Sequence, residues 1–112
     1  MNKETLEKLK GEIEKAAREL LGDKLTKVIL YGSYARGDYD EESDIDFALI
    51  STIPNSDIPF YNDRIGEITS RLGIKYLSVI SLMIISTETF DKYRDILPFY
   101  MNIIKEGIVI NG

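Results

Sequence analysis

The stretch that decides the fold reads Val-Ile-Leu-Tyr-Gly-Ser-Tyr-Ala-Arg-Gly over residues 28–37 and Ser-Asp-Ile-Asp-Phe-Ala-Leu-Ile over residues 43–50. An apolar run opens this stretch and another closes it. We therefore predict a strand over 27–31 and a second strand over 44–50. Gly-Ser breaks the first run, and the acidic segment between the strands reads as a polar loop. We interpret the two strands and their connection as one compact site.

The composition limits the chemistry that this site can perform. The chain has 112 residues, which is the size of one domain, and it contains neither cysteine nor histidine. Disulfides, thiolate nucleophiles, histidine-based hydrolysis and zinc sites built on Cys or His are therefore excluded. The remaining oxygen ligands suit hard cations such as magnesium or manganese.

Charge and hydropathy indicate which partners to expect. The net charge of −5 disfavours long nucleic acids, which are held by a basic face, but it does not disfavour a single nucleotide. The longest apolar stretch, Tyr76 to Ile85, contains two serines and is too short to span a membrane. No secretory signal precedes the first predicted helix, so we expect a cytoplasmic protein.

The rest of the chain completes one layered domain over residues 1–112. Hydrophobic periodicity predicts a helix over 4–21 that stops at Gly22, and a second helix that starts near Pro59 and is ended by Gly73. The remaining predicted elements are a strand from Lys75 to Leu82 or a little beyond, a helix from a Ser86/Thr87 cap to Tyr93, a helix from Pro98 to Lys105, and an edge strand over Gly107–Ile110. This order indicates the α/β (α+β) class, with a single mixed β-sheet flanked by helices.

Asp44 and Asp46 are candidate metal ligands. Side chains alternate along a strand, so these two carboxylates point to one face while Ile45 and Phe47 point to the core. Two aligned carboxylates repel each other, and a divalent cation that also binds phosphate oxygens removes that repulsion. The alternative is a solvated Asp-Ile-Asp at the start of a strand, which serves only to cap a loop.

Gly32 and Ser33 are candidate phosphate-binding residues. Glycine lets the backbone approach a phosphate closely, and the amides that follow would lie at the start of a helical turn. The Ser33 hydroxyl adds a further donor. The alternative is an ordinary N-cap, in which Ser33 bonds to the backbone.

The segment Gly32–Asp46 resembles the signature of the DNA polymerase β-type nucleotidyltransferase superfamily, and most closely that of its minimal (MNT) members. Those small proteins are often encoded beside HEPN-domain partners as toxin–antitoxin pairs. The resemblance implies the polymerase β-type nucleotidyltransferase fold. It also implies that Gly32 and Ser33 hold the β- and γ-phosphates, and that Asp44 and Asp46 are the catalytic pair that binds the magnesium ions bridging the triphosphate.

The resemblance extends to two further residues. Arg36 matches an arginine common in these motifs, and its implied role is either a phosphate contact or an ion pair with the acidic loop. A plain surface salt bridge remains an alternative for Arg36. Ser43 is a candidate nucleotide-binding residue, and it is also a candidate for capping or orienting the carboxylates.

One departure from the superfamily concerns its third carboxylate, which usually lies on a later strand. On the strand predicted from Lys75, Ser78 falls at about that position and Ser81 is the next polar residue. Without the third carboxylate, the catalytic metal loses a charged ligand and the attacking group lacks a base. Glu67, Asp38 and Asp40 are the candidates for a spatial substitute.

Two functions from different classes follow. The first is a metal-dependent nucleotidyltransferase that moves a nucleoside monophosphate, AMP from ATP in the first instance, onto a hydroxyl such as a tyrosine of a HEPN toxin. The second is a nucleotide-binding antitoxin or regulatory module with weak or no catalysis. A structural α/β domain with a coincidental motif is the third alternative, and a homo-oligomer is compatible with each.

Aromatic residues add two weaker expectations. Tyr31, Tyr34 and Tyr39 surround the motif and could stack on a base, although Tyr31 also fits the core. The Phe99-Tyr100 pair reads as packing, or as a partner surface if it is exposed.

Overall fold

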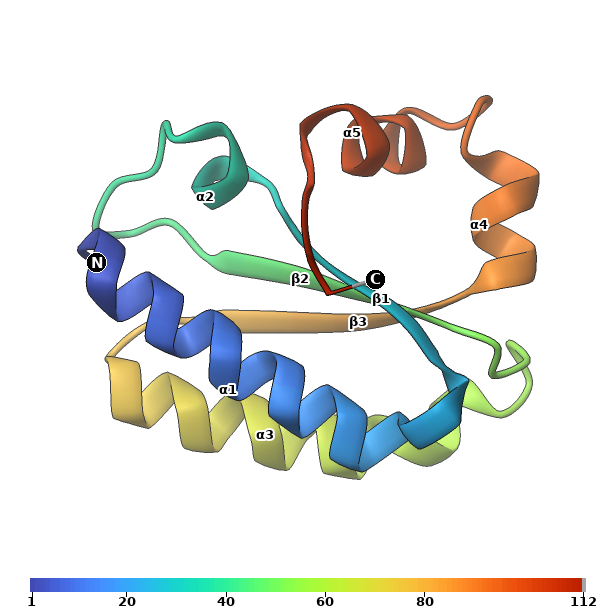
Figure 1. The fold of residues 1–112 in the computed structure, drawn as a ribbon, viewed down its shortest axis with the longest axis horizontal. Coiled ribbons are helices and arrows are strands. Elements are labelled where there is room, and N and C mark those ends of the chain that lie inside the picture. The colour runs from blue at the N-terminus through green and yellow to red at the C-terminus, as the bar shows by residue number, and fades with distance from the viewer. Residues whose placement is uncertain (112) are drawn as a thin grey trace.

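The computed structural model describes residues 1–111, and it forms one sheet with helices on both faces (Figure 1). The elements are α1 (Lys3–Leu21), η1 (Gly22–Lys24), β1 (Leu25–Tyr31), α2 (Ser33–Arg36), β2 (Ile45–Ser51), η2 (Ile58–Tyr61), α3 (Asn62–Tyr76), β3 (Ile80–Ser86), α4 (Thr87–Tyr93), α5 (Pro98–Glu106) and β4 (Ile108–Asn111). The helices η1 and η2 are short 3₁₀ segments. Among the described residues, no helix is long and apolar enough to cross a membrane.

The sheet is mixed, as predicted. Its strand order is β3-β2-β1-β4, with β1 antiparallel to both β2 and β4. Strands β2 and β3 run parallel, and helix α3 makes the crossover that a parallel pair requires. The short strand β4 closes one edge beside β1, which confirms the predicted edge strand.

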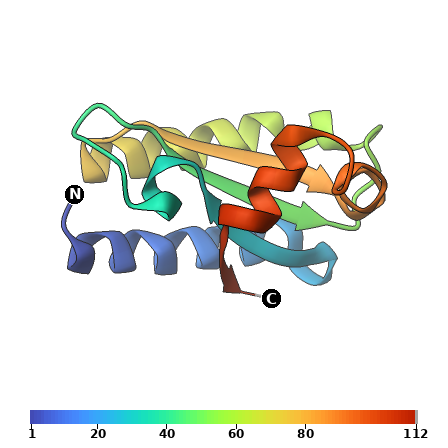
Figure 2. The ribbon, with the colours of Figure 1, turned by 90° about the horizontal axis from the view of Figure 1, so that it is seen from above.

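Alternation along the strands divides the core between the two faces of the sheet. Val28 and Leu30 of β1, together with Phe47 of β2, pack under α1 and α3 on one face. Ile29 and Ala48 point to the opposite face, where α4 and α5 cover them. Seen from above, α5 lies across the strands (Figure 2). Asp46 is two residues before Ala48 on β2, so its side chain points to the same face of the sheet, which α4 and α5 cover.

Helix α1 begins and ends close to its predicted limits because both ends carry caps. The side chain of Asn2 accepts a hydrogen bond from the Thr5 amide at 2.8 Å, and Gly22 ends the helix with a positive φ of 54°. Glu12 of α1 binds the ammonium of Lys75 at 2.6 Å and also accepts a hydrogen bond from the hydroxyl of Tyr76. These contacts fasten α1 to the end of α3.

The predicted end of helix α3 and start of strand β3 are wrong. The helix continues past Gly73 to Tyr76, and β3 begins at Ile80 rather than Lys75. Gly73 is needed for close approach, since a Cβ there would lie 2.9 Å from the carbonyl oxygen of Ser78. The helix ends instead with Leu77 in the left-handed region at φ 51°, and the Ser78 amide bonds back to the Gly73 carbonyl at 3.0 Å.

The two C-terminal helices confirm their predicted signals. The Ser86 hydroxyl accepts a hydrogen bond from the Thr89 amide at 3.1 Å and so caps α4. Pro98 occupies the first turn of α5, where its missing N–H leaves no intrahelical bond unmade. Both signals involve only neighbouring residues, and both helices start where these signals predicted.

Candidate functional site

The turn between β1 and α2 depends on glycine. Gly32 has φ 75° and ψ −156°, a conformation that residues with a Cβ rarely adopt. It lets the chain leave β1 and enter the single helical turn of α2 without a side chain at the corner. The first amides of a helical turn, here those of Ser33 and Tyr34, have no intrahelical acceptor. They are therefore available to an oxygen ligand outside the protein.

The same glycine brings the turn against Asp46. Tyr31 of β1 pairs with Asp46 of β2, so Asp46 lies directly across from the residue that precedes Gly32. A Cβ on Gly32 would lie only 2.6 Å from Oδ2 of Asp46. Two parts of the predicted motif that are separated in sequence are thus in van der Waals contact in the fold.

Asp44 and Asp46 form an electrostatically strained pair. Asp44 is exposed immediately before β2, whereas Asp46 is half-buried within the strand. Burial raises the pKa of Asp46, and the negative charge of Asp44 raises it further. Burial together with the charge of Asp46 raises the pKa of Tyr31 to about 12. A divalent cation would remove this repulsion, and two carboxylates in a chain without His or Cys suit Mg²⁺ or Mn²⁺.

The structure places Ser81, not Ser78, beside the carboxylates. In the parallel pairing of β2 with β3, Asp46 is opposite Ser81, and the two side chains share a face. Ser78 lies before β3 and donates its hydroxyl to the carbonyl oxygen of Tyr76 at 3.0 Å. The prediction that Ser78 lies on this strand is therefore wrong, because β3 starts later than its apolar run indicated, and Ser81 is the serine that pairs with Asp46.

The three acids considered as spatial substitutes for the third carboxylate either bind other groups or lie away from Asp46. Glu67 lies on α3, on the face of the sheet opposite Asp46, in a groove between α1 and α3. Asp38 pairs with the guanidinium of Arg36 at 3.1 Å. Asp40 accepts hydrogen bonds from within its own loop. Across residues 1–111, no three acidic side chains come together as a metal cluster.

Arg36 and Ser43 make specific contacts around the motif. Arg36 joins the acidic loop to α5, since it binds Asp38 at 3.1 Å and Glu106 at 3.2 Å, and these hydrogen bonds raise its pKa. The Ser43 hydroxyl accepts a hydrogen bond from the Asp40 amide at 3.0 Å and lies 3.2 Å from an Asp40 carboxylate oxygen. Ser43 therefore shapes the loop that leads into Asp44.

The fold brings two residues of α5 to the motif, where the sequence did not predict them. Phe99, which the sequence indicated as packing or as a partner surface, contacts Tyr31 edge to face, with ring centroids 5.7 Å apart, and is 41% exposed. Glu106 reaches Arg36 from the end of the same helix. No local pattern predicts either contact, because α5 meets β1 only through the tertiary fold. Tyr34 and Tyr39 instead stack on each other, with centroids 4.0 Å apart.

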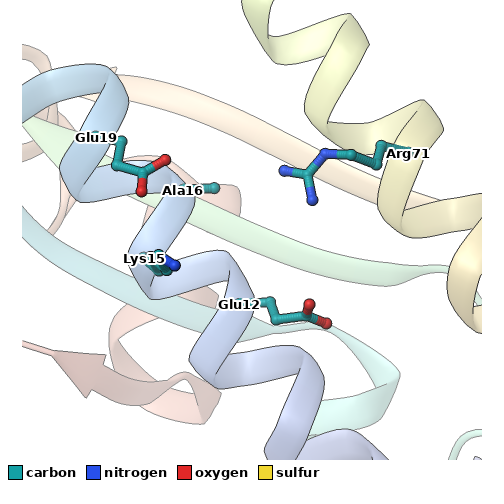
Figure 3. A pocket seen from close by; sticks show the side chains of 5 residues that line it. All are labelled: Glu12, Lys15, Ala16, Glu19 and Arg71. Atoms are coloured by element: carbon teal, nitrogen blue, oxygen red, sulfur yellow. The ribbon is translucent and has the colours of Figure 1, made fainter.

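The groove in Figure 3 is separate from this site. It has a volume of about 280 Å³ and lies between α1 and α3, on the other side of the sheet from Asp46. Its lining residues are Glu12, Lys15, Ala16 and Glu19 of α1 and Arg71 of α3. In Figure 3, Glu12 and Glu19 of α1 and Arg71 of α3 extend into the space between the two helices, which is consistent with helix–helix packing.

The glycine turn therefore lies against one of two paired carboxylates on a mixed sheet. The family model of the nucleotidyltransferase domain matches residues 10–110, and the chain belongs to this family. Two curated proteins of Methanocaldococcus jannaschii are similar to it. "Putative protein adenylyltransferase MJ0604" is 36% identical over 104 residues, which cover 93% of this chain and 96% of that protein. "Putative protein adenylyltransferase MJ0141" is 46% identical over 74 residues, which cover 65% of this chain and 72% of that protein.

Solved structures share the fold at lower identity. A toxin–antitoxin crystal structure with AMP-PNP matches with a TM-score of 0.62 and 23% identity, over 92% of this chain and 73% of that one. A structure of a tri-AMPylated Shewanella oneidensis HEPN toxin in complex with an MNT antitoxin matches with a TM-score of 0.55 and 21% identity, over 92% of this chain and 69% of that one. These matches identify the fold as that of the MNT nucleotidyltransferases.

Proposed function

We propose that residues 1–112 act as one metal-dependent nucleotidyltransferase domain that transfers AMP from ATP to a hydroxyl group of an acceptor. The observation that carries this proposal is the contact between Gly32 and Asp46. It brings the phosphate turn and the acidic pair into one site, where a triphosphate and its cation could be held together. Since ATP is the substrate, we infer that the protein works in the cytoplasm.

The roles of the site residues follow from their positions. Asp44 and Asp46 would hold Mg²⁺ or Mn²⁺, which when bound supplies positive charge to the phosphate oxygens. Gly32 leaves room for the β- and γ-phosphates against the backbone, and the Ser33 amide and hydroxyl donate to them. The acceptor hydroxyl would release its proton to solvent as its oxygen bonds to the α-phosphorus, the bond from the α-phosphorus to the oxygen that bridges it to the β-phosphorus would break, and pyrophosphate would leave.

Arg36 and Ser43 would support the same site. Arg36 is exposed and held by two carboxylates, so its guanidinium can exchange Glu106 for a phosphate oxygen without losing a buried partner. Ser43 holds the acidic loop against Asp40 and thereby orients Asp44.

We further propose that the acceptor is a tyrosine of a HEPN-type toxin. The two similar M. jannaschii proteins carry the description "putative protein adenylyltransferase", and one structure of similar fold contains a tri-AMPylated HEPN toxin. The small domain also leaves the acceptor to be supplied by a partner. An acceptor hydroxyl on a second protein fits both observations.

The test is transfer of radiolabelled AMP from ATP to the partner protein, with and without Mg²⁺. Transfer should require the metal and disappear in Asp44→Asn and in Asp46→Asn. Asp57→Asn is the matched control, since Asp57 is exposed beside η2, at the far end of the sheet, and should leave transfer unchanged. Equal transfer by Asp46→Asn and the wild type would refute the assignment.

A second candidate function is a nucleotide-binding antitoxin module with weak or no transfer. The position of Ser81 supports it, because an uncharged hydroxyl, and not a carboxylate, stands opposite Asp46 on the strand that follows α3. Ser81→Asp separates the two functions. If the wild type binds ATP without transfer and Ser81→Asp gains transfer, the module is supported. If the wild type already transfers AMP, the enzyme is supported.

A further inference from the structure

Three apolar side chains at one corner of the sheet are exposed without contributing to the core. Ile74 in the last turn of α3 is 77% exposed, Leu77 is 91% exposed, and Val79 just before β3 is 65% exposed. Ile74 and Val79 line one hollow of about 360 Å³ beside β3, which is an edge strand. We call these three residues the edge patch.

The position of Leu77 does not stabilise the isolated chain. It is the one non-glycine residue with positive φ among the described residues, and an L-residue there costs about 1–2 kcal/mol relative to glycine. Burial of the leucine side chain would offset that cost, but the side chain is exposed. Glycine or asparagine would end α3 more favourably, so the leucine indicates a contact outside the chain.

The edge patch adjoins the acidic site. The Ile45 amide donates to the Val79 carbonyl at 2.9 Å, and Asp44 is the residue immediately before Ile45. In Figures 1 and 2, the loop that connects α2 to β2 and the start of β3 lie at the same end of the sheet. A molecule seated on Leu77 and Val79 would therefore reach the carboxylates.

The charge of the adjoining loop decides which molecule fits. The loop carries five carboxylates, Asp38, Asp40, Glu41, Glu42 and Asp44. Within residues 1–111, only Asp38 of these five takes part in an ion pair. Such a surface repels nucleic acid, and it repels a second copy of this chain, whose own loop and net charge of −5 are acidic. It attracts a basic protein surface.

We propose that the edge patch and the acidic loop together form the docking surface for the acceptor protein, which presents an apolar anchor among lysines or arginines beside its acceptor hydroxyl. This inference rests on the proposed AMP transfer. The anchor sits on Leu77 and Val79, the basic side chains face the loop, and the hydroxyl is directed toward Asp44. The surface selects the acceptor without contacting the nucleotide.

The experiment uses the full chain and a fluorescent peptide in which a tyrosine lies between a leucine and several lysines. The same peptide with glutamates in place of lysines is the comparison probe. Anisotropy measures peptide binding in the presence of Mg²⁺ and AMP-PNP, and a transfer assay measures KM for the peptide and for ATP. Wild type should bind the lysine peptide at least tenfold more tightly than the glutamate peptide.

The variants locate the docking surface. Leu77→Asn, which suits the left-handed conformation, should raise Kd and KM for the lysine peptide about tenfold and leave KM for ATP unchanged. Val79→Thr should act in the same direction. Phe60→Asn is the matched control, because Phe60 is 82% exposed on η2, about 20 Å away at the other end of α3, and should change neither constant.

The outcomes separate this inference from the proposed function. If the wild type transfers no AMP but binds the lysine peptide through Leu77, the docking surface stands and the enzyme assignment fails. If transfer occurs but Leu77→Asn and Phe60→Asn have equal KM for the peptide, the docking surface is refuted. Absence of peptide binding, or equal affinity for both peptides, also refutes it.

Discussion

Replacing Gly32 with alanine should damage both the fold and the site, for two separable reasons. The backbone of Gly32, at φ 75° and ψ −156°, lies in a region that is nearly restricted to glycine, and an alanine there costs about 1–3 kcal/mol. The new Cβ would also lie 2.6 Å from Oδ2 of Asp46. The carboxylate can rotate away at small steric cost, but it then leaves the position from which it would hold a cation.

Gly37→Ala is the matched control for the backbone cost alone. Gly37 also has a positive φ, of 87°, and lies in the left-handed region, but nothing lies within 4 Å of a Cβ built there. Its alanine variant should lose about 1–2 kcal/mol of stability through the backbone. Both variants are measured by urea unfolding, and each kcal/mol corresponds to a fall in Tm of about 4 °C.

The distinguishing measurement is calorimetry of ATP binding with Mg²⁺, at a temperature where both variants are folded. Gly37→Ala should bind as the wild type does, because its site is intact. Gly32→Ala should bind at least tenfold more weakly, since the turn and Asp46 can no longer meet. If both variants bind equally well, or lose affinity equally, the contact between Gly32 and Asp46 is not what assembles the site.

Three further predictions concern titration and the arginine. The pKa of Asp46 in the folded protein is raised above its ordinary 3.8, so ionisation of Asp46 lowers the stability of the fold. Without metal, Asp46→Asn should therefore melt at a higher temperature than the wild type near pH 7, and this difference should disappear below about pH 3.8. The pKa of Glu12 is lowered from 4.5, chiefly by the hydrogen bond from Lys75 and then by that from Tyr76. Tyr76→Phe should therefore lower the free energy of unfolding in urea by about 0.5–1 kcal/mol at neutral pH, and this difference should be lost as the pH falls below about 4.5. Arg36→Gln should weaken calorimetric ATP binding while leaving Tm nearly unchanged because the side chain is exposed, and binding unaltered in Arg36→Gln would argue against its phosphate contact.

The outcome for the third strand shows where sequence reasoning stopped. The apolar run after Gly73 indicated a strand that starts at Lys75, because Gly commonly ends a helix. Gly73 instead makes room for the Ser78 carbonyl, and the helix ends four residues later at a leucine in the left-handed conformation. The strand that pairs with β2 therefore begins after Ser78, and Ser81 is the residue opposite Asp46. Register between strands depends on contacts distant in sequence, so a local pattern could not fix it.

By itself, the sequence limited the possible chemistry and determined several local elements. It limited metal ligands to oxygen ligands, and it marked the glycine turn, Asp44 and Asp46, the Ser86 cap and the start of α5, because each of these signals lies within a few neighbouring residues. Only the tertiary structure decided that Gly32 touches Asp46, that Ser81 faces it, and that Val79, two residues after the exposed Leu77, bonds to Ile45 at the end of the acidic loop. These pairings join residues far apart in the chain, and they arise when the strands and helices bury their apolar faces against one another.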